Sequence, residues 1–344
     1  MHMSDALLSP AVAIAFDAVS AASIGISVAK VKGDVFSEKK IPIMGVAGAL
    51  VFAGQMINFT IPGTGSSGHI GGGIMLAGLL GGVPAFLSIA AVLIIQCLFF
   101  ADGGLLALGC NIFNIGVIPC LVVYPLIFKP VLAKGITSKR IGFASIAACV
   151  AGLELGALGV IAQTQLSGIA ALPFGTFSAL MLPIHLAIGI IEGIVTAGVL
   201  GFIHQMRPEI TQAALNETGI KAKDLNRPIA VLAAMALLTG GVLSLYASAN
   251  PDGLEWSIDK TTQNSLGEAS ELEAEGLLHE KAADVQSQTS FLPDYSFAKD
   301  PQNSAATSIS GIVGAAITFA FASGAGLIVA KIKRLNQGKP AENG

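Results

Sequence analysis

The sequence predicts an all-α membrane protein, with a polytopic bundle of about seven helices followed by a two-helix hairpin that carries an external loop. Hydrophobic residues make up 53% of the 344 residues and charged residues only 12%, about half of the roughly 25% that is usual in soluble domains. Apolar stretches recur along the chain, and basic residues are confined to a few segments between them. These observations exclude an ordinary water-soluble domain, and the net charge of -3 leaves no footprint for nucleic acid.

Nine apolar stretches give the predicted helices in chain order. Most approach the length of about 20 residues that a helix needs to cross a bilayer. The third is short, and only Gly81, Gly82 and Val83 separate it from Pro84 in the fourth, so whether it fully spans the membrane stays open. The predicted ranges are 8–30, 42–60, 70–82, 84–100, 111–128, 141–162, 183–205, 228–248 and 309–331.

The distribution of basic residues predicts the orientation of the chain. Sixteen of the 19 Lys and Arg residues fall in four segments, and the other three lie in 249–308 together with eleven Asp and Glu. Because cytoplasmic segments of membrane proteins carry an excess of Lys and Arg, we expect an outside N-terminus and a cytoplasmic C-terminus. The four segments contain Lys30, Lys32, Lys39 and Lys40; Lys129, Lys134, Lys139 and Arg140; Arg207, Lys221, Lys223 and Arg227; and Lys331, Lys333, Arg334 and Lys339.

A polar linker, 207–227, divides the chain into two predicted units. Residues 1–222 form the seven-helix unit. Residues 223–344 form the two-helix hairpin, and 249–308 is its external loop.

Part of this loop, 263–288, is polar and acidic, so we expect it to be solvated and flexible. We likewise expect His279 in the loop, and His204 near the inner face, to be accessible to solvent without a special role.

His2 is the sharpest candidate for metal binding. The Met1 amine, the His2 amide nitrogen and the His2 imidazole can close two chelate rings, which places three nitrogens in one plane. Ni(II) and Cu(II) best compensate the cost of deprotonating an amide in such a field. His69 can provide a fourth nitrogen, because the predicted topology puts its loop on the same outer face. The alternative is that His2 belongs to a disordered end and that His69 is an interfacial residue.

The loop around His69, 63–73, has almost no side-chain bulk, so its backbone can approach an ion closely. Its G-x-G-x-x-G pattern at Gly63, Gly65 and Gly68 lies between membrane helices and outside any βαβ unit, which excludes a dinucleotide site. The sequence also contains no P-loop. We therefore predict no enzymatic activity and no cofactor, and any ATP hydrolysis must occur on another subunit.

Polar side chains inside or beside the apolar stretches are candidates for a second shell around the ion. His185 and Glu192 are seven residues apart, two helical turns, and so share one face. For each candidate the competing interpretation is a hydrogen bond between helices. The candidates are Asn58, Gln96, Asp102, Asn111, Asn114, His185 and Glu192.

Several motifs follow one another from residue 1 to about 205, and two more lie in the C-terminal unit. They are Met1-His2, Gln55–Phe59 with Pro62–Thr64 and Ser67–His69, Asp102–Gly109 with Asn111–Asn114, Pro183–Gly189 with Glu192, and then Pro251–Trp256 and Pro293–Tyr295. The first set resembles the CbiM/NikM family, the substrate-binding membrane subunits of energy-coupling factor transporters for cobalt and nickel. The second resembles the PDGLE domain of the small CbiN/NikN subunit, so the chain resembles a fusion of the two.

The resemblance implies that the transported substrate is Ni(II) or Co(II), bound through Met1, His2 and His69 at the outer face of a prokaryotic cell membrane. It implies two kinds of partner: a transmembrane coupling subunit of CbiQ/NikQ type and cytoplasmic ATPases of CbiO/NikO type. The choice between the two metals stays open. The family commonly reads Met-His-Ile at its N-terminus, whereas Met3 follows His2 here, which puts the packing of the segment over the ion in question.

A proton-coupled secondary carrier for divalent metals is the alternative function. It would use the intramembrane carboxylates Asp17, Glu154 and Glu192 as a proton relay. No inverted repeat is evident in the seven-helix unit. A sensor that binds metal without transporting it is a third possibility.

Overall fold

The computed structural model describes residues 2–31, 33–37, 39–170, 172–221, 224–266, 276–297, 299–300 and 303–337, and these are almost entirely helical. The all-α prediction is confirmed. The helices are α1 (Pro10–Lys30), α2 (Lys40–Gln55), α3 (Gly73–Leu80), α4 (Gly82–Phe100), α5 (Leu108–Asn111), the wide π-type helix η3 (Ile112–Phe128), α6 (Lys129–Ala133), α7 (Ser138–Ser167), α8 (Phe174–Met206), α9 (Pro208–Leu215), α10 (Asn226–Gly241), α11 (Gly253–Leu266), α12 (Leu277–Thr289) and α13 (Ser304–Gln337). Two strands, β1 (Phe59–Ile61) and β2 (Ser66–Gly68), and the short 3₁₀ turns η1 (Asp5–Leu7), η2 (Gly33–Phe36), η4 (Leu243–Tyr246) and η5 (Pro293–Tyr295) complete the described elements.

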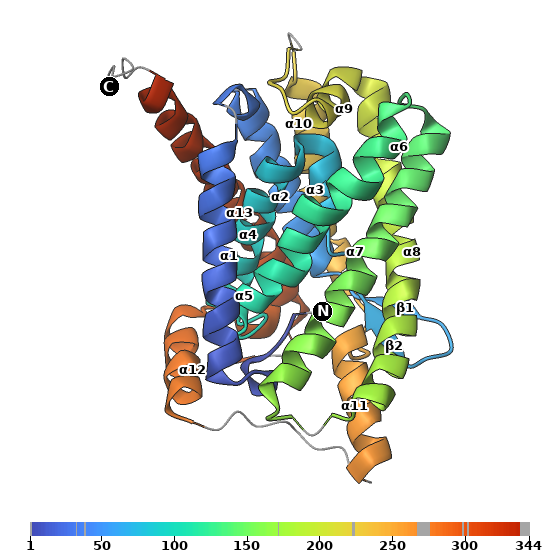
Figure 1. Cartoon of the computed structure of the whole chain (residues 1–344), viewed down its shortest axis with the longest axis vertical. Coiled ribbons are helices and arrows are strands. Elements are labelled where there is room, and N and C mark those ends of the chain that lie inside the picture. Colours follow the sequence, from blue (N-terminus) through green and yellow to red (C-terminus); the bar gives the residue numbers. More distant parts are fainter. Residues whose placement is uncertain are drawn as a thin grey trace, which may run out of the picture.

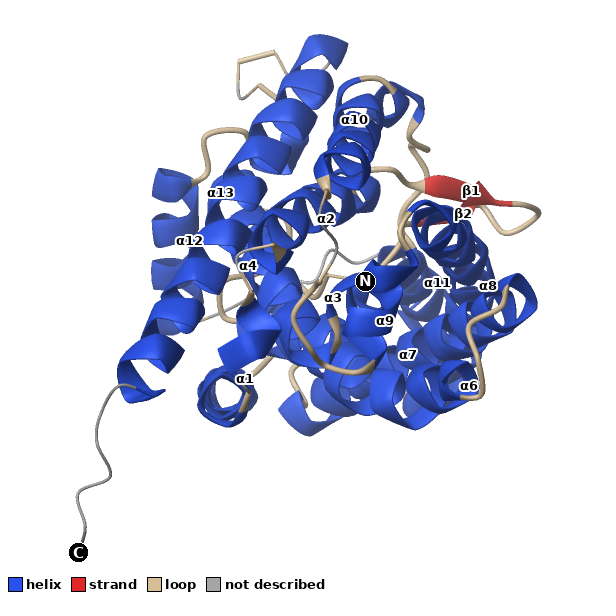
Figure 2. Cartoon of the chain, turned by 90° about the horizontal axis from the view of Figure 1, so that it is seen from above, coloured by secondary structure: helices blue, strands red, loops and turns tan. Residues whose placement is uncertain are grey.

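The helices form one bundle into which the C-terminal unit is packed (Figures 1 and 2). On one side, α7 and α8 lie against each other along their length, and η3 packs on α7. On the other side, α10 and α13 pack on α2 and on each other. The two remaining helices of the C-terminal unit also contact the bundle, α11 through α8 and α12 through α4. The predicted hairpin is therefore present, and its loop helices lie against the first unit.

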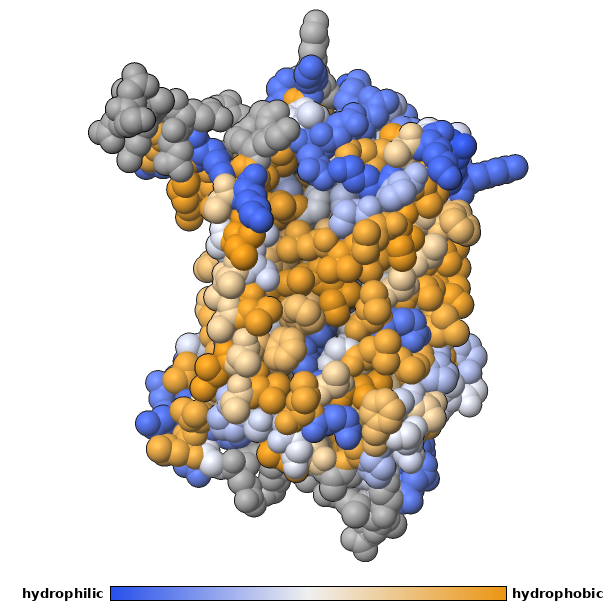
Figure 3. Space-filling model, in the orientation of Figure 1, coloured by the Kyte–Doolittle hydropathy of each residue, from blue (hydrophilic) through white to orange (hydrophobic). Residues whose placement is uncertain are grey.

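The exterior of the bundle is apolar, as expected of a protein that spans a membrane. Within the described residues, six helices are long and apolar enough to cross a bilayer, with α5, η3 and α6 counted as one continuous helix. Large apolar side chains face outward from them, among them Leu126 at 71% exposure and Phe143 at 66%. Figure 3 shows these side chains as a broad apolar band between more hydrophilic ends. The chain is a multi-pass membrane protein.

Three predicted stretches differ from the helices that the structure contains. The prediction for 228–248 runs past the end of α10 at Gly241. The prediction for 42–60 is wrong at its end: α2 stops at Gln55, and the chain turns into a hairpin in which β1 pairs antiparallel with β2. The third helix, α3, has eight residues. At 1.5 Å per residue it covers only about 12 Å of a hydrocarbon core about 30 Å thick. The segment between α2 and α4 thus brings irregular backbone into the bundle.

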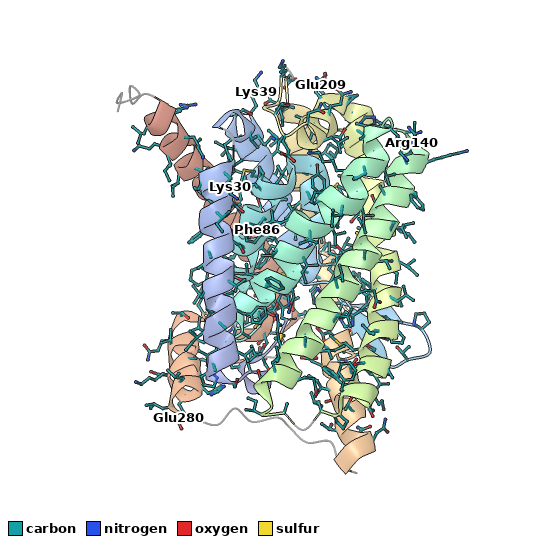
Figure 4. The ribbon with its side chains drawn as sticks, viewed as in Figure 1. Lys30, Lys39, Phe86, Arg140, Glu209 and Glu280 are labelled. Atoms are coloured by element: carbon teal, nitrogen blue, oxygen red, sulfur yellow. The ribbon has the colours of Figure 1, made fainter. Side chains whose placement is uncertain are left out.

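Charged residues separate towards the two ends of the bundle. Lys30, Lys39 and Arg140 lie at the end where α9 also lies, and Glu280 of α12 lies at the opposite end (Figure 4). At the basic end, Lys129 pairs with Glu217 at 2.6 Å. Glu209 lies at the same end as the three basic residues (Figure 4).

Two glycines allow close approach of the helices that join the C-terminal unit to the bundle. Gly311 of α13 lies against the backbone of Gly240 in α10, and a β-carbon on Gly311 would overlap the Gly240 carbonyl. Gly324, on the same helix, has open space around the position of a β-carbon. Close contact between these backbones therefore depends on Gly311.

The substitution Gly311→Leu should destabilise the protein, because the new side chain must push α10 and α13 apart. Overpacking of this kind costs about 1–3 kcal/mol, so we expect a lower midpoint of thermal unfolding in detergent. Gly324→Leu is the matched control and should leave the midpoint unchanged. Equal midpoints for the two variants would contradict the proposed contact.

Candidate metal site

The N-terminal segment, residues 2–8, is held inside the mouth of the bundle. Met3 is fully buried. The Asn111 side chain accepts a hydrogen bond from the Met3 amide at 2.8 Å and donates to the Met3 carbonyl at 3.1 Å. The Gly104 amide donates to the same carbonyl at 2.9 Å. These contacts fix the backbone next to His2.

His69 directly follows β2, in a loop whose backbone is held by a buried carboxylate. Glu192 of α8 accepts hydrogen bonds from the amides of Gly71 at 2.9 Å and Gly72 at 2.8 Å. His69 Nδ1 lies 3.1 Å from the Ile70 carbonyl. Because a carbonyl can only accept, Nδ1 carries the hydrogen and the lone pair is on Nε2. The loop thus presents His69 in the tautomer that binds metals through Nε2.

The structure brings His2 and His69 together. Their rings are stacked, with centroids 5.2 Å apart and an angle of 15° between the planes. His2 Nδ1 lies 3.2 Å from Asp102 Oδ1, and His69 Nε2 lies 3.8 Å from Asp252 Oδ2. Burial lowers the pKa of His69 to about 3 and also lowers the pKa of His2. Burial thus favours the neutral form of both rings, which is the form that binds a metal ion.

Asp252 reaches His69 because it caps helix α11. Its Oδ1 accepts hydrogen bonds from the amides of Leu254 at 2.8 Å and Glu255 at 2.9 Å, and Glu255 Oε2 accepts from the Asp252 amide at 3.3 Å. This reciprocal pattern is a capping box. The sequence analysis did not anticipate the contact between Asp252 and His69. The spacing of Asp252 and Glu255 was the available local signal.

The turn before α11 docks on the hairpin that carries His69. The Ser67 amide donates to the Pro251 carbonyl at 2.8 Å, and the Trp256 indole donates to the Thr64 carbonyl at 3.0 Å. A β-carbon on Gly253 would approach the His185 ring to 3.1 Å. The C-terminal unit is therefore part of the wall around His69.

The described side chains of 263–288 are mostly exposed, as expected of a solvated segment, but two of them, His279 and Ala282, are buried. Residues 267–275 lie outside the described residues. The expected accessibility of His279 is therefore wrong, and its Nε2 lies 2.9 Å from the Leu8 carbonyl. Gln286 donates to backbone carbonyls around the end of α4 at 2.9 and 2.8 Å. The physical reason is that main-chain carbonyls at this end of the bundle need donors, and the polar side chains of α12 supply them.

The predicted second-shell residues fall into two groups. Near His2, Asp102 accepts a hydrogen bond from the Tyr295 hydroxyl at 2.5 Å, and Gln96 lies beside the His2 ring. Asn58 and His69 lie directly beyond the Phe59–Gly68 pair of the β1–β2 hairpin, and the main-chain carbonyl of Asn58 accepts a hydrogen bond from the Ser248 amide at 2.7 Å. Tyr295, which the sequence analysis did not connect to the site, is the last residue of the second motif of the C-terminal unit.

The second group lines a cavity beneath His69. Asn114 pairs with Gln163 through two hydrogen bonds of 2.7 and 3.1 Å. His185 Nδ1 lies 2.8 Å from the Met181 carbonyl, and its Nε2 has no hydrogen-bond partner among the described residues. Both side chains face the cavity, as does Glu192. Interhelical bonding and a role near the ion are both compatible with these positions.

Side chains alone do not complete a metal site. Among the described residues, no group of three or more His, Cys, Asp and Glu side chains is arranged to hold an ion. Of the predicted nitrogen ligands, Met1 lies outside the described residues. A metal ion in this region would therefore need donors besides these side chains.

Comparison with known proteins places the chain in a family. Residues 2–210 match the model of the cobalt uptake substrate-specific transmembrane region, CbiM, and residues 226–331 match the PDGLE domain. The "Probable fused nickel transport protein LarMN" of Lactiplantibacillus plantarum is 33% identical over 275 residues, which cover 76% of this chain and 80% of that one. The cobalt transport protein CbiM of Sorangium cellulosum is 31% identical over 182 residues, covering 49% and 75%.

A solved structure also resembles the fold of this chain. The crystal structure of a transition metal transporter aligns with a TM-score of 0.53 at 28% identity, covering 61% of this chain and 95% of that chain. The family model matches more than half of the sequence, and the residues that surround His2 and His69 lie within it or within the PDGLE domain. The chain belongs to the CbiM family of cobalt uptake transmembrane proteins and carries a PDGLE domain fused to its C-terminal side.

Proposed function

We propose that this chain is the substrate-capture subunit of an ATP-driven transporter of the energy-coupling factor type that imports Ni(II) or Co(II). The observation that carries the proposal is the stacked pair of neutral imidazoles, His2 and His69, at one end of a membrane bundle. Family membership and the transport proteins named among the relatives support a role in nickel or cobalt transport.

The proposed ligands are the Met1 amine, the His2 amide and Nδ1 nitrogens, and His69 Nε2. The rings are 5.2 Å apart and stacked. An imidazole lone pair lies in the plane of its ring, so the two rings must turn towards each other to bind one ion at metal–nitrogen distances of about 2.0–2.1 Å. Binding through His2 Nδ1 replaces its contact with Asp102. A planar field of nitrogens favours Ni(II), although selectivity also depends on metal availability.

The proposed site faces the outside of the cell. Lys30, Lys39 and Arg140 mark the opposite end of the bundle, which the positive-inside rule assigns to the cytoplasm. There, a coupling subunit of CbiQ/NikQ type and ATPases of CbiO/NikO type would bind. They would reorient the loaded subunit and release the ion inward.

The substitutions His2→Ala and His69→Ala should each abolish binding of Ni(II) and Co(II), because each removes an imidazole donor. Isothermal calorimetry on the purified full chain measures this. His204→Ala is the control, since His204 lies in α8 and bonds Thr211 of α9, at the basic end. A Gly-Ser extension before Met1 should also abolish binding, because it turns the amine into an amide. Binding that survives these changes would rule out the nitrogen site.

The N-terminal segment is the proposed closure over the ion, and Asn111 is its clamp. Asn111→Ala removes two hydrogen bonds to Met3. At about 1 kcal/mol each, their loss should raise the opening of the segment, and the rate of metal release, roughly 30-fold. Competition with a chelator in stopped flow measures the release rate. Gln212→Ala, an exposed residue of α9, should have no effect, and an unchanged rate for Asn111→Ala would exclude the clamp.

Uptake in cells should require the coupling subunit and an ATPase with an intact P-loop, and should persist when a protonophore collapses the proton gradient. The proton-coupled carrier predicts the reverse. Against that alternative, Asp17 accepts a hydrogen bond from the Gly109 amide, and Glu192 accepts hydrogen bonds from the amides of Gly71 and Gly72. These hydrogen bonds give each carboxylate a structural role. Radioactive nickel uptake with and without the partner genes distinguishes the two functions.

A further inference from the structure

We propose that Asp102 and Tyr295 form a latch through which the PDGLE domain senses whether the metal site is loaded. In the empty chain, Tyr295 holds Asp102, and Asp102 holds the imidazole of His2. An ion that binds His2 Nδ1 displaces Asp102, and the hydrogen bond of Tyr295 changes as a result. This inference rests on the proposed function and adds to it a positioning role for a residue of the C-terminal unit.

The contacts of Asp102 connect the PDGLE domain to His2 without a gap. The Tyr295 hydroxyl donates to Asp102 Oδ2 at 2.5 Å, and Asp102 Oδ1 lies 3.2 Å from His2 Nδ1. A carboxylate can only accept, so the hydrogen of the His2 ring is on Nδ1. His2 Nε2 agrees with this assignment: it is buried without a hydrogen-bond partner among the described residues, and a hydrogen there would be an unpaired donor.

This arrangement belongs to the empty site only. In the proposed nitrogen site, His2 Nδ1 binds the ion, so it cannot also donate to Asp102. Both side chains line a polar cavity at the outer end of the bundle. Nδ1 releases its hydrogen to solvent in this cavity and Nε2 takes one up, so the ring stays neutral. Asp102 then keeps Tyr295 as its only donor of the two, and because linked hydrogen bonds polarise one another, the bond from Tyr295 changes.

Tyr295 is held in place by aromatic packing and by an unusual backbone. Its ring stacks on Phe100 of α4, with centroids 5.1 Å apart and 24° between the planes, and meets Phe52 of α2 edge-on at 6.2 Å. Asp294 and Tyr295 are both left-handed, with φ of 49° and 57°. Such backbone is unfavourable for residues other than glycine and persists where surrounding contacts fix it. The conformation aims the Tyr295 hydroxyl at Asp102.

The position of Tyr295 allows a change in the latch to reach the other end of the bundle. The turn η5, which ends at Tyr295, contacts both α4 and the long helix α13. Helix α13 extends from this region to the basic end (Figure 1). There, Lys333 donates to the Ala29 carbonyl at 2.7 Å, near the end of α1. The helix that adjoins the latch therefore also contacts the side on which the proposed partners bind.

The test is fluorine NMR of the full chain in nanodiscs, with 3-fluorotyrosine at its three tyrosines, Tyr124, Tyr246 and Tyr295. Planar four-coordinate Ni(II) is diamagnetic, so a changed shift reports the hydrogen bond of the hydroxyl. Ni(II) should shift the Tyr295 resonance, which Tyr295→Phe identifies by its absence. The resonances of Tyr124, which bonds Ala214 of α9, and of the exposed Tyr246 should stay fixed.

Two variants test the order of the contacts. In Asp102→Ala the proposed nitrogen donors remain, so calorimetry should still show Ni(II) binding, but the Tyr295 resonance should no longer respond to it. His2→Ala without metal should mimic loading, because the donor to Asp102 is gone: the Tyr295 resonance should move in the direction that Ni(II) moves it in the wild type. Asp294→Asn, which removes an exposed carboxylate next to Tyr295, is the control and should keep the Ni(II)-induced shift.

A Tyr295 resonance that stays fixed while calorimetry shows Ni(II) bound to the wild type would overturn the latch and retain the proposed function. A Ni(II)-induced shift that persists in Asp102→Ala would also overturn it, because the signal would then bypass Asp102. If Asp102→Ala binds no Ni(II), the His2→Ala spectrum decides, and an unmoved Tyr295 resonance there rejects the latch. A wild type that binds neither Ni(II) nor Co(II) would instead overturn the proposed function.

Discussion

The architecture around the candidate site depends on one constraint: irregular backbone inside a membrane bundle must find hydrogen-bond partners within the protein. Two such segments meet here, the N-terminal segment and the loop after β2. Glu192 satisfies two amides of the loop, and Asn111 satisfies both the amide and the carbonyl of Met3. Because these partners come from the rigid helices α8 and α5, satisfying the backbone also fixes where His2 and His69 lie.

The same constraint explains the sequence of the PDGLE motif. Pro251 precedes the helix and offers its carbonyl to the His69 hairpin. Asp252 and Glu255 form the capping box, and Gly253 is needed because the His185 ring and Ile188 leave no space for a β-carbon. Leu254 is buried. Each position thus has a local physical role, and the sum of these roles is to hold one Asp252 oxygen towards His69.

Hydropathy was sufficient to predict the helical bundle and its C-terminal helix pair, because lipid-facing helices must be apolar along their whole length. It failed where the chain is apolar for another reason. The end of the 42–60 stretch is a turn and the start of the half-exposed strand β1, and its apolar residues have the same composition as the end of a helix. Nor could the sequence foretell that α12 covers the N-terminal segment, since a buried His279 and a solvated one look alike in a polar stretch. The contact of His69 with Asp252 joins residues 183 positions apart. It depends on the packing of α11 on α8 and on the hydrogen bonds of the turn before α11 and of Trp256 to the β1–β2 hairpin.

Burial has opposite effects on the two kinds of group at this site, and their combination suits a divalent cation. For the imidazoles, loss of hydration disfavours the charged form, so His2 and His69 stay neutral and their lone pairs remain available. Because their pKa values are lowered, the folded state keeps its full stability above the ordinary pKa of histidine. Its free energy of unfolding decreases as the pH falls below that value, since protonation then favours the unfolded chain. The carboxylates of Asp102 and Asp252 are placed where hydrogen bonds support their charge. Neutral donors with adjacent fixed negative charge attract a cation and exclude anions, and they leave the choice among cations to the geometry of the ligands.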